Sequence, residues 1–117
     1  MRHQVKKHRL GRPRDARRIL LNNLATSLIL HDKIQTTEAK AKALQPLMDK
    51  LINDAKNTNK HMAIKAINTV LKSELGAKKL IEKICIQYAD KKSGYTRITR
   101  IGFRAGDSAP LVQIELA

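Results

Sequence analysis

The amino-acid sequence predicts an α+β fold in which about four helices pack on a small, mostly antiparallel three-stranded sheet, with an extended basic tail at the N-terminus. Three observations lead to this prediction. Apolar residues recur at helical spacing from about residue 16 to residue 90, and the period changes to two after Gly94. The first fourteen residues follow neither period, and only Val5 and Leu10 among them are aliphatic.

Basic residues dominate the start of the chain. Residues 1–18 contain eight Lys or Arg and one acidic residue. A segment with so few apolar side chains cannot offset its ordering entropy by burial. We therefore expect residues 1–14 to form a basic extension that becomes ordered only against phosphate, and residues 15–117 to form a single α+β domain. The alternative is a tail that is merely solvated.

The first two predicted helices span about residues 16–31 and 38–56. Pro13 and Asp15 are typical of a helix start, and Asp15 could cap free N–H groups. Thr37 could cap the second helix, which carries the strongest apolar stripe of the chain. Pro46 lies inside that stripe and removes one hydrogen bond, so a kink or a later helix start near residue 45 is an alternative.

Two further helices are predicted over about residues 60–72 and 74–90. Ser73 could cap the second of them. Its inward-facing residues are expected to be Ala77, Leu80, Ile81, Ile84 and Tyr88. Buried among such residues, the single Cys85 is expected to be a small hydrophobic core residue.

Alternation with period two predicts two strands after the turn at Ser93-Gly94. Polar and apolar residues alternate from Tyr95 to Ile101 and again over 111–116, with Gly106-Asp107-Ser108 in the loop between them. A lone hairpin is marginally stable, so the β-prone segment 33–37 is expected to add a third strand.

Charge predicts the class of partner. The chain of 117 residues has 24 Lys and Arg against 10 Asp and Glu, a formal net charge of +14. Residues 91–104 hold five basic residues and no acid, whereas residues 19–90 are nearly balanced. This pattern indicates a scaffold with two electropositive attachments that bind a polyanion. Nucleic acid is the commonest such partner, and an anionic membrane surface is the competitor.

Several classes are excluded by the same composition. No stretch approaches the roughly 18–20 apolar residues that cross a bilayer. One cysteine cannot form an intramolecular disulfide or a cysteine-based zinc site, and His3 and His8 lack further convincing metal ligands. No acid/base pair or nucleophile with a partner base is evident. We therefore expect no enzyme, cofactor, metal, membrane contact or small-molecule substrate, and a cytoplasmic location.

Ordered segments of the chain resemble one known family. They include Leu24-Ala25-Thr26-Ser27-Leu28, Lys33-Ile34-Gln35-Thr36-Thr37, Gly94-Tyr95-Thr96-Arg97-Ile98 and 102–110, which reads Gly-Phe-Arg-Ala-Gly-Asp-Ser-Ala-Pro. In these segments, and in the opening Met1-Arg2-His3, the sequence is similar to the bacterial large-subunit ribosomal protein seventeen family over essentially its whole length. Pro13, Asp15 and Pro46 depart from the family pattern, and residues 57–80 match weakly.

The resemblance implies a function. It implies a structural, ribosome-bound protein that binds large-subunit rRNA and neighbouring ribosomal proteins on the solvent side, near the exit of the peptide tunnel. Lys and Arg side chains neutralise phosphates, and Arg also stacks on unpaired bases. The RNA-binding residues are expected to be Arg2, His3, Lys6, Lys7, His8, Arg9, Arg12, Arg14, Arg17, Arg18, Lys33, Lys91, Lys92, Tyr95, Thr96, Arg97, Arg100 and Arg104.

Aromatic residues leave alternatives open in the second basic segment. Tyr95 either stacks on RNA or packs on the helices, and packing is favoured because the core has few aromatics. Phe103 is expected in the core. In an extended strand, Arg97 would point to the same side as Tyr95 and Thr99, and Arg100 to the other.

Two rival functions share the basic charge. An architectural DNA-binding protein should show a groove-binding device, but no wedge of exposed apolar residues or dimerising heptad is evident in the sequence. An enzyme acting on RNA would need a catalytic constellation, which the sequence does not offer.

Overall fold

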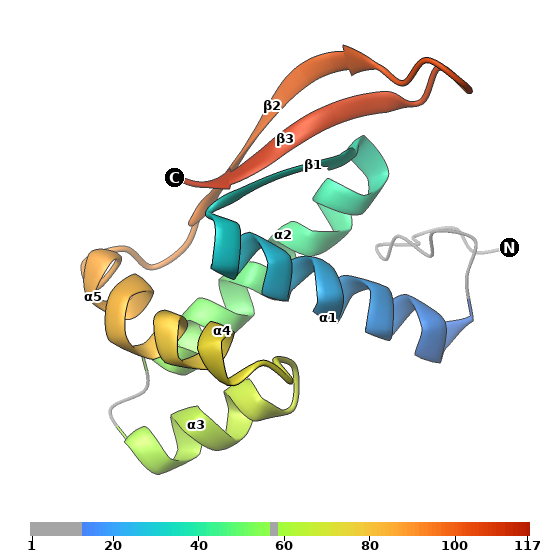
Figure 1. The fold of residues 1–117 in the computed structure, drawn as a ribbon. Helices are drawn as coiled ribbons and strands as arrows, with labels where there is room; N and C mark the ends of the chain where they lie inside the picture. The colour runs from blue at the N-terminus through green and yellow to red at the C-terminus, as the bar shows by residue number, and fades with distance from the viewer. Residues whose placement is uncertain (1–12, 57–58) are drawn as a thin grey trace, which may run out of the picture.

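The computed structural model describes residues 13–56 and 59–117 as helices on one side of a three-stranded sheet (Figure 1). The elements are α1 (Arg14–His31), β1 (Lys33–Thr37), α2 (Glu38–Ala55), α3 (Lys60–Asn68), α4 (Glu74–Lys79), η1 (Leu80–Ile84), α5 (Cys85–Gln87), β2 (Thr96–Phe103) and β3 (Pro110–Leu116). Because α4, η1 and α5 follow one another without a break, the described residues form four helical segments. The predicted α+β class is confirmed.

Helix α1 leads directly into the sheet. It begins at Arg14, two residues before the predicted start, with Pro13 at the N-cap position. Asp15 lies in the first turn and makes no capping hydrogen bond, so the predicted cap is wrong. At the other end, Asp32 adopts a left-handed conformation with φ of 68°, and its N–H donates to the Leu28 carbonyl. This left-handed residue ends the helix and directs the chain into β1, which begins at Lys33.

Helix α2 runs unbroken through Pro46. It covers 18 residues from Glu38 to Ala55, close to the prediction, and the alternative start near residue 45 is wrong. Pro46 has no N–H to donate to the carbonyl of Lys42, one turn earlier. Because Pro46 is exposed, this carbonyl lies on the solvent side of the helix. Thr37 occupies the N-cap position, but its side chain makes no capping bond.

The last two helical segments are shorter or less regular than predicted. Helix α3 ends at Asn68, where the Thr69 hydroxyl donates to the Ala66 carbonyl at 2.7 Å and draws the chain out of the helix. Ser73 caps α4 as predicted, because its hydroxyl accepts from the Gly76 N–H at 3.2 Å. The five-residue π-helical turn η1 was not predicted, and the helix ends at Gln87 rather than near residue 90.

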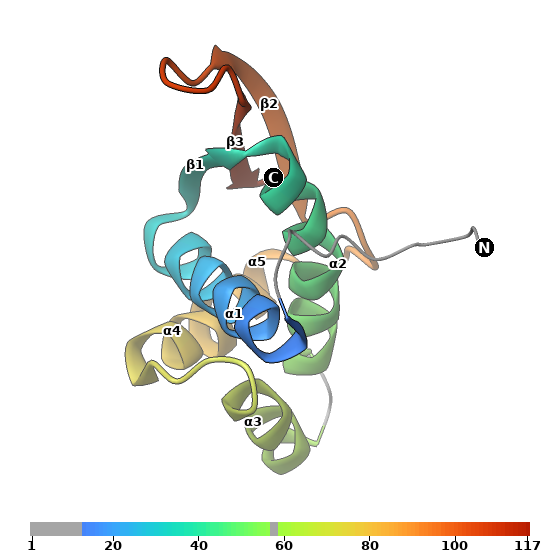
Figure 2. The same cartoon turned by 90° about the vertical axis from the view of Figure 1, so that its right-hand side faces the viewer.

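The sheet has the order β1-β3-β2, and both pairs are antiparallel. Ile34, Ile114 and Ile98 lie opposite one another on the face toward the helices. Since side chains alternate along strands, the neighbouring row of Lys33, Glu115 and Arg97 faces away from them. Figure 2 shows the helices below the sheet and no helix above it.

The core lies between the sheet and the four helical segments and is mainly aliphatic, as predicted. Its fully buried members include Leu28, Leu44, Ile52, Leu80 and Ile114. Cys85 is 8% exposed and packs in the same cluster, which confirms the expectation for this residue.

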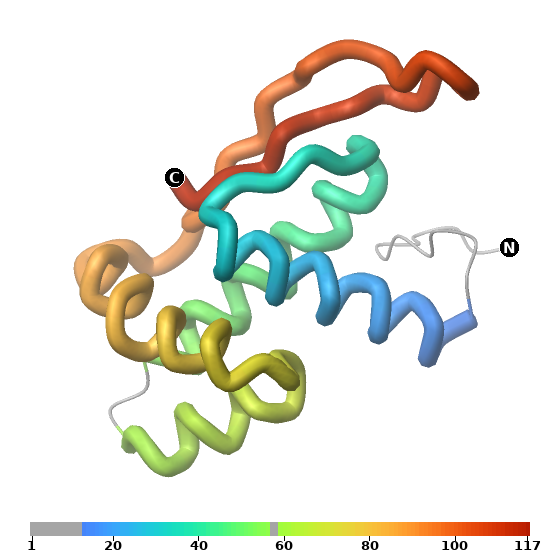
Figure 3. The backbone as a smooth tube through the Cα atoms, in the orientation of Figure 1, coloured from blue at the N-terminus to red at the C-terminus, as the bar shows by residue number. Residues whose placement is uncertain are grey.

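Phe103 is not in the core, contrary to the prediction. It ends β2 and is 71% exposed. The tube in Figure 3 shows the loop of the β2–β3 hairpin extending beyond the start of α2, the helix that contacts both of these strands. The register shifts between Arg100 and Gly102, which places Ile101 opposite no residue of β3 and leaves it 49% exposed.

Candidate nucleic-acid interface

Seven of the predicted RNA-binding residues lie outside the described residues. They are Arg2, His3, Lys6, Lys7, His8, Arg9 and Arg12. Arg14 was assigned to the basic extension but belongs to α1. The described part of the predicted site therefore begins at the first turn of this helix.

Three arginines gather at the first turn of α1. Arg14, Arg17 and Arg18 line a surface hollow of about 260 Å³ that α2 closes with Leu47. Asp15 approaches Arg18 at 3.8 Å, but both side chains are largely exposed, so this pair contributes little to stability. Arg14 and Arg17 form no ion pair with another described residue. The free N–H groups of the helix start add further positive potential, so the hollow is suited to an anion.

A second set of cations lies on the outer face of the sheet. Lys33 of β1 and Arg97 of β2 flank Glu115 of β3 in one row, and Lys33 and Arg97 are exposed. In the described part of the chain, neither cation forms an ion pair. The next row consists of Gln35, Gln113 and Thr99, so polar donors continue across the face.

The length of α1 separates these two cationic surfaces. An 18-residue helix is about 27 Å long, and Lys33 follows its C-terminal end by two residues. Figure 1 shows the first turn of α1 at the opposite end of the helix from the start of β1. The scaffold thus holds the two surfaces at a fixed distance.

Two other predicted arginines are tied to carboxylates. Arg100 lies 3.6 Å from Glu38, which also receives a 2.9 Å bond from Lys42. The hydrogen bond and charge of Lys42, followed by the charge of Arg100, lower the pKa of Glu38. Arg104 binds both carboxylate oxygens of Asp107, at 3.0 and 2.6 Å.

The Arg104–Asp107 pair closes the hairpin loop. Asp107 Oδ1 also accepts from the Ala109 N–H at 3.2 Å, and the Arg104 N–H donates to the Ala109 carbonyl at 2.8 Å. The bonds from Arg104 and then the bond from Ala109 lower the pKa of Asp107 to about 2. Arg104 therefore holds its own loop together, and much of its charge is neutralised there.

Tyr95 must be removed from the candidate interface. Its ring is fully buried and lies 5.5 Å from the ring of Tyr88, which confirms the packing interpretation. Its hydroxyl accepts from Lys56 Nζ at 3.0 Å and donates to Asn53 Oδ1 at 2.5 Å. Because Gly94 has a φ of 68° and β2 begins only at Thr96, Tyr95 does not share the exposed face of Arg97 as the alternation predicted.

The remaining predicted residues differ in accessibility. Lys91 and Lys92 are exposed, although Lys91 Nζ donates to the Gly94 carbonyl at 3.2 Å. Thr96 is half-buried, and its hydroxyl accepts from Gln45 Nε2 at 3.3 Å. Only Lys92 in this group has a charge without a partner among the described residues.

Sequence reasoning missed the role of Lys56. Its ammonium donates to the carbonyl of Lys91 and to the Tyr95 hydroxyl, and it lies 5.2 Å from the centre of the Tyr95 ring. These contacts join residues 35 and 39 positions apart, so no local pattern could have signalled them. Lys56 fastens the connection between α5 and β2 to the end of α2.

The described residues offer no obvious catalytic or metal centre. Burial raises the pKa of the Cys85 thiol, which disfavours the nucleophilic thiolate. Within residues 13–56 and 59–117, no three His, Cys, Asp or Glu side chains converge as a metal site would require. A search of the same residues for a helix long and apolar enough to cross a membrane found none.

Comparisons with known proteins agree on one family. The family described as Ribosomal protein L17 matches residues 20–117. A large ribosomal subunit protein bL17 from Neorickettsia sennetsu is 42% identical over 115 residues, which cover 98% of each chain. Proteins of the same name from Thermotoga sp. (strain RQ2) and Moorella thermoacetica are 43% and 44% identical, over 99% and 92% of this chain and 94% and 96% of theirs. The chain therefore belongs to the ribosomal protein L17 family.

Proposed function

We propose that this chain is a structural constituent of the large ribosomal subunit in the cytoplasm, where it binds and stabilises large-subunit rRNA and contacts neighbouring ribosomal proteins. The relatives that match nearly the whole chain carry the name of a large ribosomal subunit protein. The interface would comprise the basic extension of residues 1–14, the first turn of α1 and the basic region of the β2–β3 hairpin. The protein would act by binding, without catalysis.

One observation carries this proposal: four of the predicted RNA-binding residues that form no ion pair with a described residue lie near the two ends of α1. Arg14 and Arg17 are at its start, and Lys33 and Arg97 are on the outer sheet face beyond its end. Two separated cationic surfaces on a rigid scaffold can hold two RNA segments at a set distance. Electrostatic neutralisation then supplies affinity, and the separation supplies selectivity for shape.

The rival function is an architectural DNA-binding protein. The exposed Ile101 and Phe103 on a two-stranded ribbon correct the expectation that the chain shows no apolar wedge. Such wedges kink duplex DNA when they enter its minor groove. However, Arg104 beside them is held by Asp107, which leaves this end of the ribbon with little net charge. Family membership also favours rRNA.

Sedimentation of the tagged chain from cell lysate through a high-salt sucrose gradient tests the proposal. We expect stoichiometric migration with the large subunit. Loss from ribosomes in high salt, with DNA recovered instead, would contradict the proposal and favour the rival. Depletion of the protein should impair large-subunit assembly.

A competition experiment separates the two nucleic acids directly. The purified chain is bound to a large-subunit rRNA transcript and challenged with duplex DNA of equal phosphate concentration at one salt concentration. We expect the transcript to be retained, because selectivity for shape should exceed the electrostatic attraction common to both. Equal exchange would reduce the proposal to non-specific polyanion binding.

A further inference from the structure

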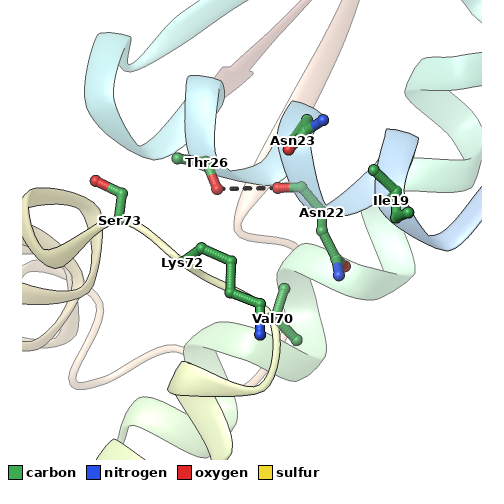
Figure 4. A pocket seen from close by; sticks show the side chains of 7 residues that line it. All are labelled: Ile19, Asn22, Asn23, Thr26, Val70, Lys72 and Ser73. Atoms are coloured by element: carbon green, nitrogen blue, oxygen red, sulfur yellow. Dashed lines mark hydrogen bonds between the residues drawn. The ribbon is translucent and has the colours of Figure 1, made fainter.

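A second surface hollow opens between α1 and the segment that joins α3 to α4. Its volume is about 390 Å³, within the range of about 300–1,000 Å³ that is typical of small-ligand sites. Its walls are residues 19, 22, 23 and 26 of α1 and residues 70, 72 and 73 of the joining segment, namely Ile19, Asn22, Asn23, Thr26, Val70, Lys72 and Ser73 (Figure 4).

Three polar side chains of this hollow, Asn22, Asn23 and Lys72, have no partner within the described part of the chain, and Asn23 is exposed. Thr26 and Ser73 are engaged, because Thr26 donates to the Asn22 carbonyl at 2.9 Å and Ser73 caps α4. In contrast, the Asn22 side-chain amide and the Lys72 ammonium make no hydrogen bond or ion pair with another described residue. Figure 4 shows both side chains reaching toward Val70 from opposite walls. A donor–acceptor amide and a cation are thus available side by side.

Apolar side chains form the rest of the hollow. Ile19 is 55% exposed, although it is β-branched and large, and Val70 is half-buried. A flat ring placed between them would remove apolar surface from water without displacing any bond of the fold. The combination of apolar walls, one amide and one cation suits three features of a nucleotide: the face of its base, the polar edge of its base and its anionic phosphate.

The hollow adjoins the cationic first turn of α1. Asn22 also lines the hollow that contains Arg14, Arg17 and Arg18, so the two hollows meet at this residue. Arg18 and Asn22 are four residues apart and therefore lie on the same side of the helix. An RNA backbone held by the arginines would pass directly over the amide.

We infer that this hollow binds one unpaired adenine nucleotide of RNA, with Asn22 on the base edge and Lys72 on the phosphate. An Asn amide pairs in bidentate fashion with adenine N6 and N7, and unpaired RNA bases are read on these edges. Ile19 and Val70 contact the faces of the base. The inference rests on the proposed function, since it specifies one contact of the proposed RNA interface.

Titration of the isotope-labelled full chain with adenosine 5′-monophosphate, followed by NMR, tests the inference. We expect the Asn22 side-chain amide and the backbone amides of Val70 and Lys72 to shift. Uridine 5′-monophosphate should shift them only at higher concentration. Asn22→Ala should weaken adenosine monophosphate binding about tenfold, within the range for one bidentate base contact. Asn68→Ala, an exposed Asn→Ala change at the end of α3, should leave it unchanged.

The role of Lys72 has its own readout. Lys72→Gln should weaken binding of adenosine monophosphate but leave binding of adenosine unchanged, because adenosine has no phosphate. Shifts confined to residues 14–18, or equal affinity of Asn22→Ala and the unchanged protein, would overturn the nucleotide site. Either result would leave co-sedimentation with the large subunit unaffected, whereas loss of co-sedimentation would contradict the proposed function itself.

Discussion

The first turn of α1 and the connection between α5 and β2 have similar basic sequences, but they have different roles. In the first turn, Arg14 and Arg17 project from the helix without an acidic partner among the described residues. In the connection, the Lys91 carbonyl and the Tyr95 hydroxyl are bound by Lys56, and the Tyr95 ring is fully buried. The first segment presents two arginines without partners, whereas the second, although Lys92 is exposed, is bound to the core through a backbone carbonyl and Tyr95.

The difference teaches that charge density alone does not identify an interface. Lys56 and Arg104 contribute to the net charge of +14 as fully as Arg14 does, yet their charged groups are engaged by oxygen atoms of the chain. A cation that is already bound must give up that partner before it can contact phosphate, which reduces its net contribution to binding. The availability of the cation, rather than the number of cations nearby, should decide which substitutions affect RNA binding.

The largest effect should follow from removing the Tyr95 side chain. Tyr95→Ala empties a fully buried site between Tyr88 and α2, so we expect the free energy of unfolding to fall by about 3–5 kcal/mol. Urea denaturation followed by circular dichroism measures this change. A loss below about 1 kcal/mol would show that the ring is not a core element.

A conservative change at the same position separates stability from binding. Tyr95→Phe keeps the ring but removes the hydroxyl bonded to Asn53 and Lys56, so about 1–3 kcal/mol should be lost. Affinity of the folded protein for rRNA should be unchanged. A lower affinity with unaltered stability would mean that Tyr95 contacts RNA after all, and would abolish the contrast between the two segments.

The next effect concerns Lys56. Lys56→Met keeps most of the aliphatic stem but removes the ammonium from the Lys91 carbonyl and the Tyr95 hydroxyl. Because Lys56 is only partly buried, we expect a loss of about 1.5 kcal/mol, the lower end for bonds to a charged group. Hydrogen exchange at residues 89–95 should accelerate more than exchange in α1. Uniform acceleration would show that Lys56 has no local role.

The opposite pattern is expected for the first turn of α1. Arg14→Gln/Arg17→Gln should leave the unfolding temperature nearly unchanged, because neither side chain is bound to a described residue. If each contacts one phosphate of a single strand, the slope of log affinity for rRNA against log salt concentration should fall by about 1.4. The charge-matched control Lys65→Gln/Lys83→Gln lies on exposed parts of α3 and η1. An equal change of slope in the control would show that binding is insensitive to position.

Local sequence patterns predicted most of the fold because most of its elements depend on local periodicity. The apolar stripe over 38–56 and the alternation over 111–116 matched α2 and β3 closely. The end of α3 and the π-helical turn η1 were missed, since they depend on a hydroxyl-to-carbonyl bond at Thr69 and on how residues 80–85 pack against the core. Phe103 was misplaced because its hydrophobicity says nothing about whether the helical layer reaches the hairpin loop.

The candidate interface was less predictable than the fold. The sequence identified the basic residues, but long-range pairing decides which of them are available. The register that aligns Lys33, Glu115 and Arg97 pairs Lys33 with a residue 82 positions away. The contacts of Tyr95 with Asn53 and Lys56 likewise cross the chain. No periodicity within a single segment carries this information.

The hairpin loop extends the comparison to a bound cation at the surface, where we expect the smallest effect. The Arg104 bonds and the Ala109 N–H hold the pKa of Asp107 at about 2, below its ordinary value of 3.8. A lowered carboxylate pKa stabilises the folded loop above about pH 4, and this contribution disappears as the pH falls through about 2. Hydrogen exchange at Ser108 and Ala109, corrected for the intrinsic pH dependence of exchange, should therefore lose protection between these two pH values. Asp107→Asn should show reduced protection already at pH 7, because the neutral amide holds Arg104 less strongly. We expect no change in the rRNA salt slope, because the loop lies at the other end of β2 from the cationic row of Arg97 and away from the first turn of α1. A slope that became steeper by about 0.7 would instead show that Arg104 binds phosphate once it is released, and that Asp107 restrains an RNA contact.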